Sequence, residues 1–236
     1  MTEALELLDN LYSSELGCVP DDFNSGKILT VSNGYIGGIR FAKGIPLVLF
    51  AITRTNSTVV SVHPVLKDAT DRIIGSKTAI DCEAYDALEQ ALNPLVDTKF
   101  WFRGCRLYCS PVTFLDKTIG IIKDVTHFDE LSKTLHAKWG GPVYGQIVDG
   151  KVVAWAAVKP LSDIGWDLSI QTLPEYRGQG YAKSVVSAAV KYIFKNGKLA
   201  TWGTDTTNAA SLSTAHSVGF QDYGLDFGCV GRIRQT

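Results

Sequence analysis

The sequence predicts an α/β (α+β) fold, with strands and helices in both halves of the chain. In residues 167–195 a strand-like segment leads through a glycine-bearing loop into apolar residues at helical spacing. Asp149-Gly150 joins two apolar segments in the manner of a tight β-hairpin. In residues 28–109 short β-like runs, separated by turn residues, outnumber the helical patterns. We therefore expect a mixed sheet flanked by helices.

Length, charge and cysteine content limit the class of protein. The 236 residues are enough for one large domain or two small ones. A net charge of -1 with scattered lysines argues against nucleic acid or an anionic membrane as a partner. The chain has no apolar run near about 20 residues and begins with acidic residues, so we expect a soluble, cytoplasmic protein. The five cysteines lack metal-ligand spacing, which predicts free thiols and no bound metal.

Residues 1–120 are predicted to form the smaller α/β domain. Helical spacing marks residues 5–16, and two more helices follow Pro64, the second with Asp81 as its N-cap. Strands are expected at residues 28–31, 35–41, 47–52, 59–63, 100–102 and 106–109. This half contains no constellation of catalytic side chains. It either completes an acceptor pocket or is a degenerate copy of the second domain.

Residues 121–236 are predicted to form the domain that carries the site. Thr126 and Asp129 resemble a capping box before a helix that ends at Gly140. The chain then predicts in order a hairpin of strands 143–148 and 151–158, a strand at 163–172, a helix at 180–195, a strand at 199–204, a helix at 208–217 and a strand at 223–229. The strand–helix–strand order around residues 180–195 favours two parallel neighbours.

The loop between strand and helix has the properties of an anion-binding site. The first turn of a helix has backbone N–H groups without partners and a positive dipole end, so it holds phosphate. Gly178 and Gly180 let a ligand approach the backbone closely. Ala182 stands where a Walker A loop needs glycine, and the loop lacks the glycine triplet of a dinucleotide-binding fold. A different phosphate-binding family is indicated.

Arg177, Gly180 and Ala182 match the spacing of a pyrophosphate loop, and Asn208 with Gly219-Phe220 forms a second motif downstream. Over about residues 126–231 the chain resembles the GNAT superfamily of N-acetyltransferases. The resemblance implies a largely antiparallel, twisted sheet flanked by helices. It also implies acetyl-CoA as co-substrate and, as acceptor, a primary amine on a small molecule or peptide.

The resemblance also implies which residues contact acetyl-CoA. The loop would hold the pyrophosphate, the preceding strand would pair with the pantetheine arm, and two residues after the next strand would contact that arm from the other side. The predicted set is Ile170, Gln171, Thr172, Arg177, Gly178, Gln179, Gly180, Tyr181, Ala182, Lys183, Asn208 and Ser211. Asn208 is equally placed to cap its own helix.

Catalysis by direct attack in a ternary complex needs a neutral amine, so a general base assists. Asp167 on the predicted cofactor strand is the first candidate for that base, and Asp163 and Asp205 are alternatives. Many family members carry a tyrosine seven residues after the motif asparagine, where it acts as the general acid. In this sequence that position is Ala215. His216 and Tyr223 are therefore the candidates for the general acid.

Two other functions remain open at this stage. Ala215 fits an acetyl-CoA-binding regulatory protein, or an inactive relative, as well as an enzyme. A scaffold that uses the fold only for packing is the third option. The acceptor is not determined by the sequence, although an acidic lining would suit a polycation. A homodimer is compatible with the sequence.

Overall fold

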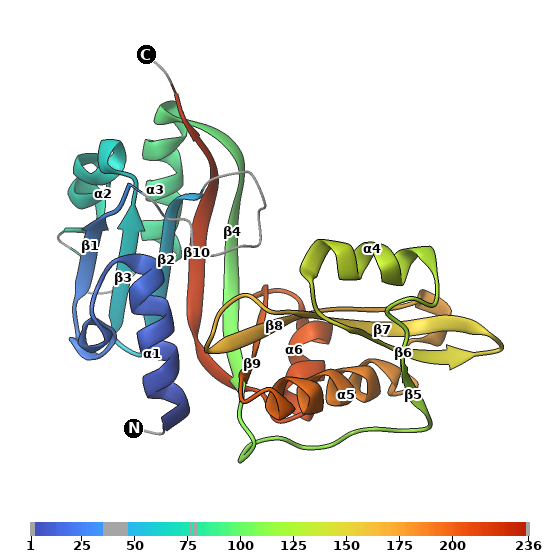
Figure 1. Ribbon diagram of the computed structural model, residues 1–236. Helices are drawn as coiled ribbons and strands as arrows, with labels where there is room; N and C mark the ends of the chain where they lie inside the picture. The colour runs from blue at the N-terminus through green and yellow to red at the C-terminus, as the bar shows by residue number, and fades with distance from the viewer. Residues whose placement is uncertain (1–2, 35–46, 76, 78–79, 235–236) are drawn as a thin grey trace. The chain divides into compact units, whose positions relative to one another are not determined.

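The computed structural model describes residues 3–34, 47–75, 77 and 80–234. These residues contain ten strands and six α-helices, and most of the strand pairs are antiparallel (Figure 1). The predicted mixed, largely antiparallel α/β architecture is thus confirmed. The predicted strand at residues 35–41 lies outside the described residues. Within the described part, none of the helices has the length and apolar character needed to span a membrane.

The chain forms two compact units, Met1–Cys105 with Tyr223–Thr236, and Arg106–Asp222. These bounds differ from the division at residue 120 expected from the sequence, because the last strand returns to the first unit. The strand β4 (Val96–Cys109) runs from the first unit into the second. The sequence suggested two strands here, whereas the structure has a single strand that continues through Gly104.

The first unit consists of a sheet and three helices. Its elements are α1 (Glu3–Leu16), β1 (Ile28–Ser32), β2 (Leu47–Arg54), β3 (Ser57–Val62), α2 (Lys67–Ile74), α3 (Cys82–Leu92), the first part of β4 and most of β10 (Gln221–Ile233). Strands β1 and β3 are parallel, whereas β2 is antiparallel to both of its neighbours, β3 and β10. Asp81 caps α3 as predicted, its carboxylate accepting the Ala84 N–H at 2.8 Å.

A buried polar cluster lies within the first unit. Arg54 forms an ion pair with Asp9, whose side chain is 2% exposed. The Tyr223 hydroxyl donates to Asp9 at 2.8 Å, and the Tyr223 ring lies 4.9 Å from the Tyr12 ring centre. Buried charges are tolerated when each is paired and hydrogen-bonded, as they are here.

The second unit is built from β5 (Ile122–Asp124), α4 (Glu130–Trp139), β6 (Val143–Val148), β7 (Lys151–Lys159), β8 (Gly165–Thr172), α5 (Tyr181–Lys195), β9 (Leu199–Asp205) and α6 (Ala209–Ser217). The strands follow the order β9-β8-β7-β6-β5. Helices α4 and α5 cover opposite faces of this sheet (Figure 1). The predicted β6–β7 hairpin is confirmed, with positive φ at both Asp149 and Gly150.

The start of α4 corrects one expectation. Asp129 is the N-cap, and its carboxylate accepts the Ser132 N–H at 2.7 Å. Thr126 is not its capping partner: the Thr126 hydroxyl donates to Asp124 at 2.5 Å and accepts the Val143 N–H at 3.0 Å. Thr126 therefore joins β5 to β6, a tertiary contact that local spacing does not reveal.

Candidate active site

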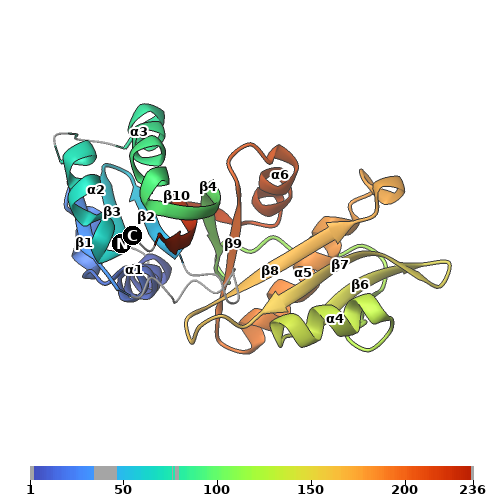
Figure 2. The same ribbon diagram turned by 90° about the horizontal axis from the view of Figure 1, so that it is seen from above.

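Strands β8 and β9 separate partway along their length. Strand β8 pairs with β7 from Asp167 to Thr172, but its register with β9 covers only Gly165 to Asp167. Figure 2 shows the two strands diverging beyond that point. Backbone groups of β8 after Asp167 are thereby available on the β9 side, and such groups need hydrogen-bond partners. An extended ligand could supply them.

The glycine loop lies where β8 leads into α5. Gly178 and Gly180 have φ values of 77° and 82°, in the left-handed region that glycine adopts without strain. Gly180 is the N-cap of α5 and provides no side-chain cap. The N–H groups of Tyr181, Ala182 and Lys183 therefore have no acceptor within the helix. They form a positive end suited to phosphate.

A segment that we call the strap, residues 115–121, runs along α5 and supports the loop. The Ser184 hydroxyl accepts the Ile119 N–H at 2.9 Å and donates to the Ile119 carbonyl at 3.0 Å. Ser187 accepts the Lys117 N–H at 2.9 Å. The Lys191 ammonium forms an ion pair with the Asp116 carboxylate at 2.6 Å. Its hydrogen bond is the main cause that lowers the pKa of the Asp116 carboxyl to about 2. The Ile119 side chain lies directly against Gly180.

Replacing Ser184 with alanine is expected to loosen the strap beside the loop. Both backbone groups of Ile119 would lose their partner, at a cost of about 1–3 kcal/mol. Amide hydrogen exchange should then accelerate around Ile119 and in the first turn of α5. Ser187→Ala is the matched control, because it removes a hydroxyl one turn later and should accelerate exchange at Lys117 instead. Identical exchange patterns in the two variants would contradict this role for Ser184.

The diverging strands and the loop enclose a cleft of about 830 Å³. Its lining comes from the ends of β7 and β9, from β8, the loop and the first turns of α5 and α6. The residues are Lys159, Leu168, Ser169, Ile170, Gln171, Thr172, Tyr176, Arg177, Gly178, Gly180, Tyr181, Ala182, Lys183, Trp202, Gly203, Asn208, Ala210, Ser211, Ser213 and Thr214. Every residue predicted to bind the cofactor is among them except Gln179, which is exposed between the two loop glycines.

Two details of the cleft fit a polar, extended ligand such as acetyl-CoA. The Thr172 hydroxyl is buried and has no hydrogen-bond partner among the described residues. Asn208 caps α6 by accepting the Ser211 N–H at 3.1 Å, and Ser211 in turn accepts the Trp202 indole N–H at 3.0 Å. Asn208 and Ser211 thus shape the α6 side of the cleft. The capping role expected as an alternative for Asn208 coexists with its place in the lining.

The three candidate bases have different surroundings. Asp167 is buried at the last position of β8 that pairs with β9. One of its carboxylate oxygens accepts the Leu168 N–H at 2.6 Å, and the other lies 3.7 Å from the Lys159 ammonium. Asp205 accepts the hydroxyl and N–H of Thr207, which lower the pKa of its carboxyl. Asp163 is exposed. Asp167 is the candidate adjacent to cleft-lining residues.

The two candidate acids are both engaged elsewhere. His216 lies at the C-terminal end of α6, with its Nε2 3.0 Å from Asp222, whereas the cleft is lined by the first turns of that helix. Tyr223 belongs to the first unit, where burial and then the Asp9 charge raise the pKa of its phenol. Ala215 is fully buried. The described part of the second unit therefore places neither candidate in the cleft lining.

Sequence reasoning missed several lining residues. Leu168 and Ser169 belong to the strand that the sequence predicts, so their place in the lining could have been predicted too. Lys159 could not have been predicted, because its position at the cleft depends on its register opposite Asp167 on the neighbouring strand. No local motif marks that register.

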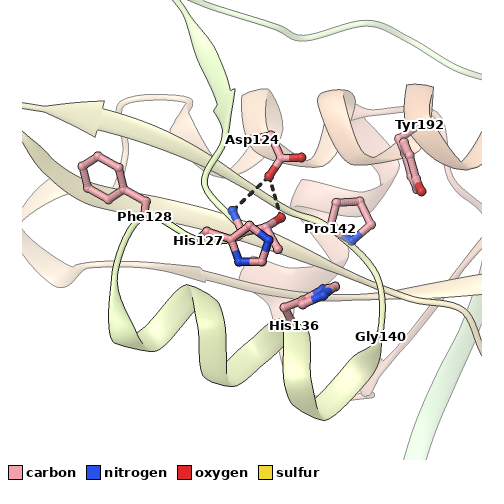
Figure 3. A pocket seen from close by; sticks show the side chains of 8 residues that line it. Asp124, His127, Phe128, His136, Gly140, Pro142 and Tyr192 are labelled. Atoms are coloured by element: carbon pink, nitrogen blue, oxygen red, sulfur yellow. Dashed lines mark hydrogen bonds between the residues drawn. The ribbon is translucent and has the colours of Figure 1, made fainter.

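A second, open pocket of about 520 Å³ lies beside α4 (Figure 3). His127 and His136 face each other there, with ring centres 5.6 Å apart. The Asp124 carboxylate accepts two hydrogen bonds from Thr126, and His136 Nδ1 lies 2.9 Å from the Gly141 carbonyl oxygen. In the portion of the chain that is described, no three His, Cys, Asp or Glu side chains are placed to hold a metal ion.

Comparison with known proteins identifies the domain. A family model described as the acetyltransferase (GNAT) family matches residues 115–220. A GNAT-family protein from Novosphingobium aromaticivorans is similar in structure over 60% of this chain and 69% of its own, with 19% identity and a TM-score of 0.51. A GNAT acetyltransferase from Colwellia psychrerythraea covers 97% of this chain and 98% of its own at 14% identity and a TM-score of 0.48.

A Salmonella typhimurium protein, solved with its cofactor acetyl-CoA, matches 45% of this chain and 72% of its own at 19% identity and a TM-score of 0.34. A search of curated proteins found no match. The family match spans the strap, the splayed strands, the glycine loop and both predicted motifs. Residues 115–220, a little under half of the chain, thus match the acetyltransferase (GNAT) family.

Proposed function

We propose that the protein is an N-acetyltransferase that moves the acetyl group of acetyl-CoA to a primary amine by direct attack in a ternary complex. The observation that carries this proposal is the cleft in which the free side of β8 meets a left-handed glycine loop and the start of α5. An extended chain attached to a pyrophosphate matches both parts of it. Acetyl-CoA, whose pantetheine arm is joined to a pyrophosphate, is such a molecule.

Different parts of the cleft bind different parts of acetyl-CoA. The N–H groups of the loop and of the first turn of α5 bind the pyrophosphate, and Arg177 and Lys183 supply positive charge. Backbone groups of Leu168 to Thr172 pair with the pantetheine arm. An N–H aimed at the thioester oxygen stabilises the charge that develops there, which is typically the largest catalytic contribution.

Proton transfer is assigned to Asp167. Its carboxylate removes the proton from the acceptor ammonium, the amine nitrogen forms a bond to the acetyl carbon, and the carbon–sulfur bond breaks. The nitrogen then loses its second proton and the departing thiolate takes one up. A thiolate leaves readily near its pKa of about 8.5, so the missing tyrosine does not block the step.

Calorimetry with acetyl-CoA and an assay of free thiol with a panel of amines test this function. We expect binding at micromolar concentrations and amine-dependent thiol release. Absence of acetyl-CoA binding would disprove the proposal. Tight binding without product from any amine would support the second candidate, an acetyl-CoA-binding regulatory protein. That candidate is favoured by one observation. Apart from residues 176–183, Lys159 is the only ionisable side chain among the described residues that line the cleft.

A further inference from the structure

At the end of the cleft away from the glycine loop, the lining residue Lys159 is paired with Asp167, which adjoins the lining. Lys159 is the last residue of β7 and lies directly across from Asp167 on β8. Partners in an antiparallel register project from the same face of a sheet. Their side chains are 13% and 10% exposed, and Lys159 lines the cleft. This pair stands where β8 and β9 begin to separate.

The pair is not a closed ion pair. Charge-assisted N–H···O bonds are about 2.7–2.9 Å long, whereas Lys159 Nζ lies 3.7 Å from the Asp167 oxygen. The ammonium also lies 4.8 Å from the centre of the Trp139 ring, a cation–π contact that leaves its N–H donors uncommitted. Both charges can therefore accept a further partner without breaking a hydrogen bond between them.

The charged side chains that line the cleft have one sign. Lys159, Arg177 and Lys183 line it, and no carboxylate does so among the described residues. Arg177 and Lys183 belong to the phosphate end, so Lys159 is the lining cation that remains for the acceptor. A polycationic acceptor, which an acidic lining would have suited, is thus disfavoured by like-charge repulsion.

On the basis of the proposed function, we infer that the acceptor is an α-amino acid, whose carboxylate binds Lys159 and whose amino group is directed to Asp167. An α-amino acid carries a negative and a positive group separated by one carbon atom. It therefore complements a positive and a negative group held 3.7 Å apart. Lys159 is then the residue that determines specificity, and the product is an N-acetylated amino acid.

The first test uses the unmodified protein with acetyl-CoA and each of the twenty common amino acids. Each amino acid that reacts is compared with the amine obtained by removing its carboxylate, for example histidine with histamine and phenylalanine with phenethylamine. We expect kcat/KM at least about 10-fold higher for the amino acid, since a hydrogen bond to a charged group contributes that much discrimination. Spermidine should react poorly.

The second test replaces Lys159 with methionine, which keeps the length and removes the charge. The KM for the amino acid should rise about 10- to 100-fold, whereas the KM for its decarboxylated counterpart should stay constant or fall because a repulsive charge is gone. Lys159→Arg should restore part of the amino acid preference. Lys151→Met is the matched control, since Lys151 begins the same strand and forms a similar but exposed pair with Glu175 at 3.6 Å. It should leave the preference unchanged.

The outcomes separate this inference from the proposed function. Equal or better turnover of the decarboxylated amines would overturn the inference and leave an N-acetyltransferase of another specificity. Acetyl-CoA binding without turnover of any amino acid would also overturn it. Failure to bind acetyl-CoA would overturn the proposed function itself. If Lys159→Met does not fold, the comparison of amino acid with amine in the unmodified protein still decides.

Discussion

Replacing Gly180 with glutamate is expected to weaken acetyl-CoA binding by at least about 100-fold. The new carboxylate would stand at the N-terminal end of α5, where the helix dipole and free N–H groups would otherwise attract phosphate. The backbone there has a φ of 82°, which costs a non-glycine residue about 1–3 kcal/mol. A Cβ would also lie 3.2 Å from the Ile119 side chain of the strap. Calorimetry measures the loss directly.

Gly197→Glu is the matched control for that experiment. Gly197 follows the other end of α5, has a φ of 69° and has no atom within 4 Å of the Cβ position. The same charge and similar backbone strain are introduced there, away from the loop. Gly180→Ala separates shape from charge and should show a smaller loss. If Gly180→Glu bound acetyl-CoA as tightly as Gly197→Glu, the loop would not be the phosphate site, and the scaffold function would be favoured.

Replacing Asp9 with alanine is expected to destabilise the first unit by about 3–5 kcal/mol. The substitution leaves Arg54 as a buried charge without its partner and removes the acceptor of the Tyr223 hydroxyl. Because a chain of two units need not unfold in one step, amide hydrogen exchange of β2 and β10 measures the effect better than a single melting temperature. Exchange at both strands should accelerate.

Two further variants test this explanation. Asp97→Ala removes an exposed partner of Arg234 and should cost less than about 1 kcal/mol. Tyr223→Phe removes only the hydroxyl donor and should cost about 1.5–3 kcal/mol, since its acceptor is charged. An Asp9→Ala protein as stable as Asp97→Ala would show that the buried cluster contributes nothing to folding.

Local features of the second unit were predictable because each depends on residues close together in the chain. Asp149-Gly150 specifies a hairpin through two positive φ angles. The loop glycines adopt left-handed angles for the same steric reason. The residues predicted from the loop motif line the cleft, with the exception of Gln179. Caps such as Asp81 follow from short-range hydrogen bonds.

Features that depend on distant segments were not predictable in the same way. The residues around Gly104 predict a break between two strands, yet a single strand passes through it. Thr126 was expected to cap a helix and instead bonds to β6. Tyr223 follows the second motif closely, yet the fold places its hydroxyl on Asp9, more than two hundred positions earlier in the chain.

By itself, the sequence determined the mixed α/β class, the left-handed glycine loop before α5 and the family match of residues 115–220, because glycine angles, helix starts and motif spacing are properties of contiguous residues. Only the tertiary structure decided where β8 leaves β9 and which side chains meet there. Lys159 and Asp167 are eight positions apart, and only the strand register brings their charges together at the end of the cleft. Register is set by packing of the whole sheet, and so the identity of the acceptor depends on it.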